Sequence, residues 1–306
     1  MRHRHISSVG SSLAQDTIGI SRRAPARTSQ VGRADVRIAR FAIDDEVGYG
    51  VVGEAREDGP PGTGGGGQIV APLSGHPFGP GPDAIRLTGT SHRLDDARLL
   101  APVLPSKVIA VGKNYADHAR EMGGEPPAEP ILFLKPSTAI SGPGDPIRYP
   151  VGLTQRVDYE GELAVIIGRL CREVPASQAA EVIFGYTCAN DVTARDLQER
   201  DGQSARAKSF DTFCPLGPWI ETDVDPADLE LVTSVNGEIR QRARTSQLLH
   251  DVAALVAYAS NVMTLLTGDV LLTGTPAGVG PLEVGDEVSV TIENIGTLTN
   301  PVAKRD

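Results

Sequence analysis

The 306-residue sequence is poor in aromatic side chains, poor in cysteine and free of long apolar runs. Aromatic residues make up 4% of the chain, so we expect a mainly aliphatic core. The 3 cysteines are widely spaced and form no C-x-x-C pair, which is typical of buried thiols in a reduced compartment and predicts a cytoplasmic protein. No apolar run approaches the length of a membrane span, so we expect no membrane partner.

Positive charge is also in short supply, with 29 Lys and Arg against 39 Asp and Glu and a formal net charge of −10. This balance argues against nucleic acid as the main partner. It does not exclude an anionic small substrate, because a metal and a few local basic side chains can override the global field. Segment 1–35 is rich in Arg and Ser and lacks apolar periodicity, which predicts a disordered basic tail. A transit peptide would have a similar composition.

Glycine and proline, by contrast, are plentiful, with 34 and 23 residues, which indicates many turns and a β-rich protein. With 40% hydrophobic residues, the chain can build one large core, alone or with a small satellite. Alternating apolar residues predict two strands at 36–43 and 47–52, and we assign 36–100 to a small β-rich N-terminal subdomain. The remainder, 101–306, is predicted to be the domain that carries the chemistry.

Several other stretches carry local structural signals. Asn236-Gly237 between two alternating runs predicts a two-residue type I′ hairpin turn. Asp251 is predicted to cap the clearest helix of the chain, whose apolar face extends to Leu266 before Gly268-Asp269 stops it. Apolar runs further predict buried strands at 107–112 and 131–136 and a last strand at 288–292.

The stretch 157–168 is the most informative part of the sequence. It begins with acidic residues and ends in a run of apolar, mostly β-branched ones, which is typical of a strand that enters the core. Residues i and i+2 of a strand point to the same side, so Glu160 and Glu162 share a face, and Asp158 is expected there too. Crowded carboxylates repel each other unless a cation lies among them, and a hard dication such as Mg²⁺ favours such oxygens. The alternative is an exposed strand end with solvated acids.

Another carboxylate follows the predicted strand 184–189. Asp191 is well placed to cap a helix that runs through Arg195, but it could equally be a third ligand of the same metal. On such a helix Arg195 would project near Asp191. The two side chains could form a buried ion pair, or Arg195 could be free, beside a metal, to hold a substrate carboxylate.

A polar segment follows the carboxyl end of the predicted strand 107–112. A helix that begins near Asn114 would put His118 and Glu121 on one face, at i and i+3. A carboxylate beside an imidazole fixes the tautomer and raises the basicity, as a general base requires. An incidental pair on a surface turn is the alternative. The Gly- and Pro-rich segment 123–127 that comes next is typical of a mobile loop over a site.

Five short motifs, taken in order, resemble the fumarylacetoacetate hydrolase family: 111–118, 158–163, 190–196, 207–211 and 273–280. The resemblance covers the chain from residue 107 to residue 302, and 36–100 is similar to the small N-terminal part of bacterial members. It implies an α+β, β-rich fold, the mixed β-sandwich roll of that family, and a homodimer.

The resemblance also implies a metal site and a catalytic dyad. Glu160, Glu162 and Asp191 would be the ligands of Mg²⁺ or Mn²⁺. His118 and Glu121 match the dyad that activates water in members that cleave acylpyruvates. Both assignments agree with the residue types that the strand and helix patterns single out.

Three further residues match positions that contact the substrate in the family. Lys208 matches the lysine that touches the reacting part of the substrate and would be catalytic. Arg195 and Thr275 match positions that help to hold its carboxylate. Ser204 is small where many relatives carry a bulky residue, so the resemblance does not define the size of the pocket.

The activity expected from these residues is hydrolysis of a 2,4-diketo acid, of the acylpyruvate or fumarylpyruvate type, to pyruvate and a carboxylic acid. The small anionic 2-oxo acid would chelate the metal, a metal-held enolate would form, and hydroxide generated by His118 would attack the distal carbonyl. Decarboxylation of oxaloacetate and isomerisation of 2-hydroxyhepta-2,4-diene-1,7-dioate are alternatives that share the enolate. A non-catalytic metal-binding protein of the same fold is the alternative from another class.

Overall fold

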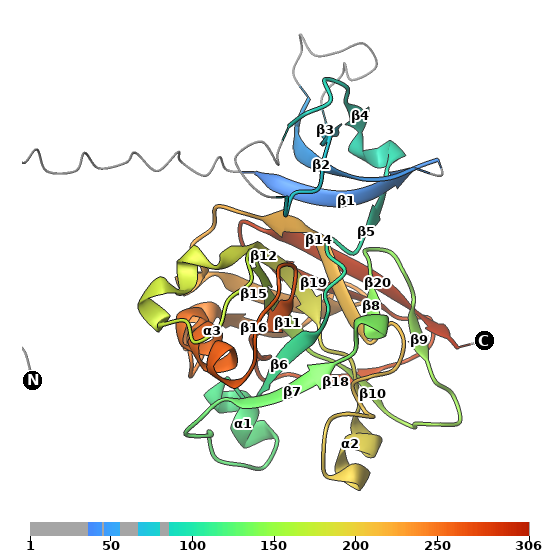
Figure 1. The fold of residues 1–306 in the computed structure, drawn as a ribbon. Helices are drawn as coiled ribbons and strands as arrows, with labels where there is room; N and C mark the ends of the chain where they lie inside the picture. Colours follow the sequence, from blue (N-terminus) through green and yellow to red (C-terminus); the bar gives the residue numbers. More distant parts are fainter. Residues whose placement is uncertain (1–35, 45, 56–66, 80–85, 306) are drawn as a thin grey trace, which may run out of the picture. The chain divides into compact units, whose positions relative to one another are not determined.

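The computed structural model describes residues 36–44, 46–55, 67–79 and 86–305, so the predicted basic tail lies outside the described residues. In these residues the chain forms three sheets and few helices, which confirms the expected β-rich α+β class (Figure 1). The described α-helices are α1 (Ala116–Glu121), α2 (Arg195–Asp201) and α3 (Val252–Val262).

The largest sheet has 12 strands. In order across the sheet they are β4 (His92–Arg93), β3 (Gln68–Pro72), β2 (Glu46–Glu54), β1 (Arg37–Ile43), β14 (Cys214–Glu221), β12 (Ile183–Asn190), β11 (Gly161–Ile167), β17 (Val270–Leu272), β6 (Val108–Gly112) and β7 (Ile131–Lys135). Two short strands lie off this path: β5 (Arg98–Leu100) pairs with β1, and β8 (Ile140–Ser141) pairs with β14.

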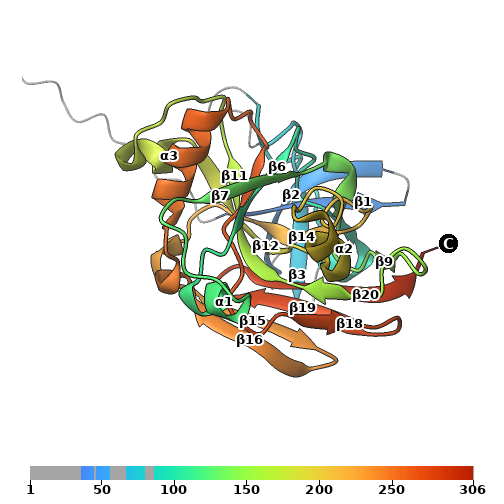
Figure 2. The same ribbon diagram turned by 90° about the horizontal axis from the view of Figure 1, so that it is seen from below.

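Two smaller sheets complete the described β-structure (Figure 2). The 3-stranded sheet has the order β13 (Thr193–Ala194), β10 (Val157–Tyr159) and β18 (Gly280–Leu282). The 5-stranded sheet has the order β16 (Glu238–Arg244), β15 (Glu230–Val235), β19 (Glu287–Ile292), β20 (Gly296–Lys304) and β9 (Ile147–Tyr149).

Strand β11 is buried along its whole length because both of its faces pack against other layers. Leu163, Val165 and Ile167 join the main apolar cluster, which includes side chains of α3 and of β15 and β19 in the 5-stranded sheet. The intervening Ala164 and Ile166 belong to a second cluster on the opposite face. The predicted strand that enters the core is therefore confirmed, with apolar packing on both of its faces.

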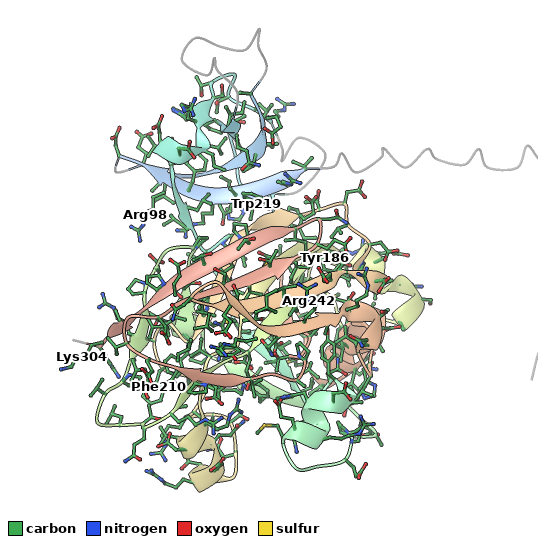
Figure 3. The ribbon with its side chains drawn as sticks, turned by 180° about the vertical axis from the view of Figure 1, so that it is seen from behind. Arg98, Tyr186, Phe210, Trp219, Arg242 and Lys304 are labelled. Carbon is green, nitrogen blue, oxygen red and sulfur yellow. The ribbon has the colours of Figure 1, made fainter. Side chains whose placement is uncertain are left out.

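The N-terminal strands share the large sheet with the rest of the chain. β1 pairs with β14 at Arg37↔Glu221 and Ile38↔Ile220. A separate apolar cluster forms where β1, β2 and β3 pack around Trp219 of β14, which Figure 3 labels beside these strands. The strands of the predicted subdomain thus share a small apolar cluster with β14, while the boundary near residue 100 stays a prediction.

Two local signals of the sequence are confirmed by backbone geometry. Asn236 and Gly237 have positive φ values of 52° and 79°, as a type I′ turn between β15 and β16 requires. The carboxylate of Asp251 accepts a hydrogen bond from the N–H of Ala254 over 2.8 Å and caps α3. All three cysteines are free thiols, and in the described residues no helix is long and apolar enough to cross a membrane.

Three predictions about strands and helices are wrong. The 131–136 run forms β7, which is not buried: it ends the sheet with β6 as its one neighbour, and Ile131 and Leu134 are 47% and 48% exposed. Helix α3 ends at Val262 rather than near Gly268, because the chain turns away there so that Leu265 can pair with Cys171. The strand at 288–292 is not the last, since β20 comes after it.

The hairpin turn allows a test of the claim that the positive φ at residue 237 favours glycine. Gly237→Ala puts a Cβ on a residue with φ of 79°, where no steric contact occurs but the conformation disfavours a side chain. We expect the free energy of unfolding, measured by urea titration, to fall by about 1 kcal/mol. Gly53→Ala is the matched control, because Gly53 of β2 also has open space around it but has an ordinary φ. An equal loss in both variants would contradict the argument.

Candidate active site

Two glutamates lie where the chain passes from one sheet to another. β10 of the 3-stranded sheet ends at Tyr159 and β11 of the large sheet begins at Gly161, so Glu160 occupies the junction. Glu162 is the second residue of β11. Strand β12 pairs with β11, and the N–H of Asp191 donates to the carbonyl oxygen of Glu160 over 2.8 Å. Strand pairing therefore brings a carboxylate from a distant part of the sequence beside both glutamates.

The carboxylates of Glu160, Glu162 and Asp191 form a buried acidic triad. One oxygen of each lies within 4.8 Å of the others, and the three residues are 4%, 1% and 1% exposed. In the described residues this is the one group of three or more such side chains with metal-ligand spacing. Hard oxygen donors in this arrangement fit Mg²⁺ or Mn²⁺.

Asp158 does not join the triad, so its expected place on the same face is wrong. Its two oxygens accept hydrogen bonds from the guanidinium groups of Arg156 and Arg195, at 2.9 to 3.1 Å. The alternation of a single strand does not extend from residue 158 to residue 162, because β10 and β11 belong to different sheets. Asp158 instead holds the guanidinium of Arg195, which also contacts Glu160 of the triad.

Asp191 does not cap a helix. Strand β13 separates it from α2, whose N-terminal flanking residue is Ala194 and lacks a side-chain cap. An ion pair between Arg195 and Asp191, one of the two possibilities for Arg195, is not formed in the described residues, since Arg195 donates to Asp158 over 2.9 Å and to Glu160 over 2.5 Å. The structure thus places Asp191 in the acidic triad, which was the other possibility for this residue.

Three buried basic side chains surround the triad. The ammonium of Lys208 lies 2.8 Å from Glu160 and 2.7 Å from Asp191. Arg195 contacts the other oxygen of Glu160, and Lys135 contacts the other oxygen of Asp191. Lys135 was missed in the sequence because it ends an apolar run on an edge strand. It is nevertheless fully buried. The presence of a charged residue at the end of an apolar run was the one feature of the sequence that could have pointed to it.

Glu162 differs from the other two acids in its partners. Its carboxylate accepts a hydrogen bond from the N–H of Gly274 over 2.6 Å, and in the described residues no Lys or Arg forms an ion pair with it. Burial, with added repulsion from Asp191 and Glu160, raises the pKa of Glu162 well above its usual range. Burial also acts to raise the pKa of Glu160, but Lys208 and Arg195 outweigh it and lower that pKa. The charge of Lys208 acts to lower the pKa of Glu162 but does not outweigh burial and repulsion, and within the described residues Glu162 has no ion pair of its own.

The predicted dyad is present at the edge of this site. His118 lies in α1 with Nδ1 3.1 Å from Oε2 of Glu121, as the i, i+3 spacing predicted. The other oxygen of Glu121 accepts a hydrogen bond from the N–H of Gly278 over 3.0 Å. Since Nδ1 must carry the proton in this pair, Nε2 of the neutral ring is free to act as a base.

Thr275 is held by a residue that the sequence did not reveal. Its hydroxyl donates to the carbonyl oxygen of Gly161 over 2.9 Å and accepts from the amide of Gln241 over 2.8 Å. Gln241 in turn accepts from the N–H of Gly161 over 3.0 Å. Both backbone groups of the residue between the two glutamates are thereby fixed. Gln241 is buried in a strand whose other side chains are mostly exposed, which a strand pattern alone does not distinguish as functional.

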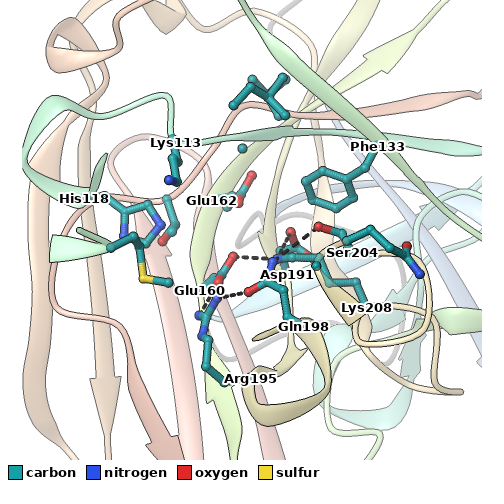
Figure 4. Close-up of a pocket in the computed structure, with 17 residues that line it drawn as sticks. Lys113, His118, Phe133, Glu160, Glu162, Asp191, Arg195, Gln198, Ser204 and Lys208 are labelled. Atoms are coloured by element: carbon teal, nitrogen blue, oxygen red, sulfur yellow. Dashed lines mark hydrogen bonds and ion pairs between the residues drawn. The ribbon is translucent and has the colours of Figure 1, made fainter. Parts of the chain in front are cut away.

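One cavity of about 330 Å³ collects these groups (Figure 4). All of the predicted site residues except Glu121 line it, and Glu121 lies behind His118. The triad and Lys208 form one wall, while His118, Met122 and Phe133 belong to the remaining lining. Arg195 lines the cavity as well, although its guanidinium is engaged by acids.

Comparison with known proteins agrees with the motifs. Residues 107–303 match the family model described as fumarylacetoacetate (FAA) hydrolase C-terminal, and residues 36–102 match the one described as Rv2993c-like, N-terminal. Protein Rv2993c of Mycobacterium tuberculosis is 55% identical over 88% of this chain and 99% of its own length. The crystal structure of 5-carboxymethyl-2-hydroxymuconate delta-isomerase from Mycobacterium smegmatis is 55% identical, with a TM-score of 0.78 over 88% of this chain and 100% of that one.

More distant relatives carry other activities in their names. Oxaloacetate tautomerase YisK of Bacillus subtilis is 42% identical over 69% of this chain and 75% of its own length. Maleylpyruvate hydrolase from Sphingobium sp. SYK-6, solved with manganese(II) and pyruvate, is 32% identical, with a TM-score of 0.70 over 88% of this chain and 100% of that one. A family model that covers most of the chain, together with these relatives, shows that the protein belongs to the fumarylacetoacetate hydrolase family, whose members are enzymes.

Proposed function

We propose that this protein is a divalent-metal-dependent enzyme that moves a proton within a small anionic 2-oxo acid, as an isomerase or a keto–enol tautomerase. The observation that carries the proposal is the buried acidic triad, in which Glu162 has no basic partner among the described residues, in the same cavity as His118. A scaffold without activity has no need of a histidine oriented by a carboxylate at the edge of such a site.

The donor set fits Mg²⁺ or Mn²⁺, with Glu160, Glu162 and Asp191 as the residues that would hold the ion. Such an ion, when bound, supplies a Lewis acid for the keto oxygen of a 2-oxo acid. Lys208 adds positive charge near the oxygen on which the enolate charge develops, and its charge also lowers the pKa of Glu160.

His118 is the proposed proton carrier. Glu121 holds Nδ1–H, so Nε2 can remove a proton from the carbon next to the keto group and return it to another position of the enolate. The hydrogen bond from Gly278 to Glu121 prevents the carboxylate from turning away from the imidazole. The pair is therefore held in the orientation that repeated proton transfer requires.

The relatives favour proton transfer over hydrolysis. The isomerase from Mycobacterium smegmatis is 55% identical to this chain and the tautomerase of Bacillus subtilis is 42% identical, whereas the structures named as hydrolases, from Exiguobacterium antarcticum and Sphingobium, are 40% and 32% identical. Hydrolysis of a 2,4-diketo acid is the second candidate. The same His118–Glu121 pair favours it, because an imidazole fixed in this tautomer can equally activate water.

The metal site can be tested without turnover. Glu162→Gln removes a ligand charge, and we expect the affinity for Mn²⁺, measured by calorimetry in the absence of substrate, to fall about 100-fold or more. Asp158→Asn is the matched control. Its oxygens contact Arg156 and Arg195 rather than the triad, so the affinity should change by less than about tenfold. Tight Mn²⁺ binding by the Glu162 variant would contradict the assignment.

The pH dependence of metal binding is set by the raised pKa of Glu162. Without metal, this carboxyl holds its proton to higher pH than usual, and the proton must leave before a dication can bind. Mn²⁺ should therefore raise the melting temperature more at about pH 8 than at about pH 6. Glu162→Gln should remove most of this difference. A metal-induced shift that stays constant across this range in the unmodified protein would contradict the prediction.

The reaction class can be tested with His118→Asn. We expect isomerisation of enolic oxaloacetate and of 2-hydroxyhepta-2,4-diene-1,7-dioate, followed by absorbance, to slow about 100-fold or more while the affinity for Mn²⁺ is retained. His92→Asn, in the N-terminal strand β4, should keep full activity. Release of pyruvate from acylpyruvates by the unmodified protein, without isomerisation, would favour the hydrolase. Failure to turn over any of these substrates with metal present would favour a non-catalytic protein.

A further inference from the structure

Lys113 is the one basic side chain of the cavity wall, in the part of the chain that the structure describes, that no acid neutralises. Three lysine or arginine residues line the cavity, and two of them, Arg195 and Lys208, are engaged by the acids of the site. No hydrogen bond or ion pair is made by the ammonium of Lys113 within the described residues. A half-buried ammonium beside a cavity, without a partner, is a place where an anionic group of a ligand is favoured.

The backbone around Lys113 directs this side chain to the cavity. Lys113 comes directly after β6 with a φ of 55°, a left-handed conformation that costs a lysine about 1 kcal/mol. The next residue is locked, because the side-chain amide of Asn114 donates to the carbonyl oxygens of Thr273 and His250 and accepts from the N–H of His250. Strain of this kind persists where the surrounding structure imposes it, and such positions cluster at ligand sites.

The ammonium of Lys113 lies beside the segment that follows α1. Figure 4 shows Lys113 on the side of the cavity near His118 and Glu162, with Ser204 on the opposite side. A Cβ built on Gly124, in the segment after α1, would lie 2.9 Å from this nitrogen. The absence of a side chain at Gly124 therefore leaves the room that the ammonium occupies.

Charge balance indicates what the ligand should carry. When all three are ionised, as ligation of a dication requires, the acids of the triad balance the three buried basic side chains Lys135, Arg195 and Lys208. A bound dication then leaves an excess of positive charge, to which Lys113 adds. The single carboxylate of a 2-oxo monoacid offsets only part of this excess, whereas a second carboxylate would offset more of it and give Lys113 a partner.

We infer that Lys113 binds the second carboxylate of a 2-oxo dicarboxylate, so that the enzyme selects dianionic over monoanionic 2-oxo acids. The inference rests on the proposed function, since it takes the oxo-acid end of the ligand to lie at the acidic triad. Lys113 is then a specificity-determining residue, which contacts the far end of the substrate and not the reacting carbon.

The test compares ligands of equal length in the Mn²⁺-loaded protein. Dissociation constants are measured by calorimetry for 2-oxoglutarate and 2-oxopentanoate, which share five carbons, and for 2-oxoadipate and 2-oxohexanoate, which share six. Lys113→Met should weaken the binding of the dianions about tenfold or more and that of the monoanions less than about twofold. Lys113→Arg should restore most of the preference for dianions.

Two further variants keep the test decisive. Lys304→Met, at the exposed end of β20 (Figure 3) and outside the cavity lining, removes one lysine charge and should leave all four constants unchanged. Gly124→Ala keeps Lys113 but displaces its ammonium, and should also weaken the dianions selectively. This variant replaces Lys113→Met should the latter fail to fold.

The outcomes separate the inference from the function on which it rests. Equal weakening of dianions and monoanions, or no weakening of either, would overturn the role of Lys113 while leaving the proposed function intact. Failure of every 2-oxo acid to bind the Mn²⁺-loaded unmodified protein would overturn both. Selective loss of the dianions in Lys113→Met, with recovery in Lys113→Arg, is the expected result.

Discussion

The burial of three carboxylates against one another is the constraint on which the rest of the site depends. Glu160, Glu162 and Asp191 would be mutually repulsive in an apolar interior, and the chain compensates with Lys135, Arg195 and Lys208. The compensation is uneven, because Glu162 receives a backbone N–H and, within the described residues, no basic side chain. The chain thus stabilises two of the acids itself and leaves the third in an environment that a dication would complete.

The fold supports this arrangement because two sheets meet at the acidic triad. The chain changes sheets at Glu160, and the adjacent Gly161 has both backbone groups held by Gln241 and Thr275. A Cβ at Gly161 would lie 2.0 Å from the hydroxyl of Thr233, so the two sheets can approach only because this position is a glycine. Glu162 therefore lies in a strand and Glu160 and Asp191 lie directly next to strand ends, whereas the histidine dyad is carried by the short helix α1.

The acidic triad and the other residues of the cavity serve different steps, which explains why relatives of one family are named for different activities. Isomerisation, tautomerisation and hydrolysis of 2-oxo acids all begin with the polarisation of a keto group, which the acidic triad and Lys208 can support in each case. Under the proposed function, the later steps would depend on where His118 places or takes a proton and on which group of the substrate occupies the far part of the cavity. Residues outside the triad, Lys113 among them, are where such differences in specificity can arise.

The sequence by itself determined the β-rich class, the type I′ turn at Asn236-Gly237, the cap of α3 and the pairing of His118 with Glu121. These features depend on neighbours within a few residues, and short-range periodicity is sufficient to predict them. The grouping of Glu160 and Glu162 was also predictable from i, i+2 spacing, while the place of Asp191 needed the family resemblance to support it. Tertiary structure alone decided that Asp158 faces Arg195 and Arg156, that Lys135 is buried at the triad, and that Gln241 reaches Gly161 from another sheet. Each of these contacts joins residues from different strands, and no local pattern records which strands become neighbours or where a strand changes sheets.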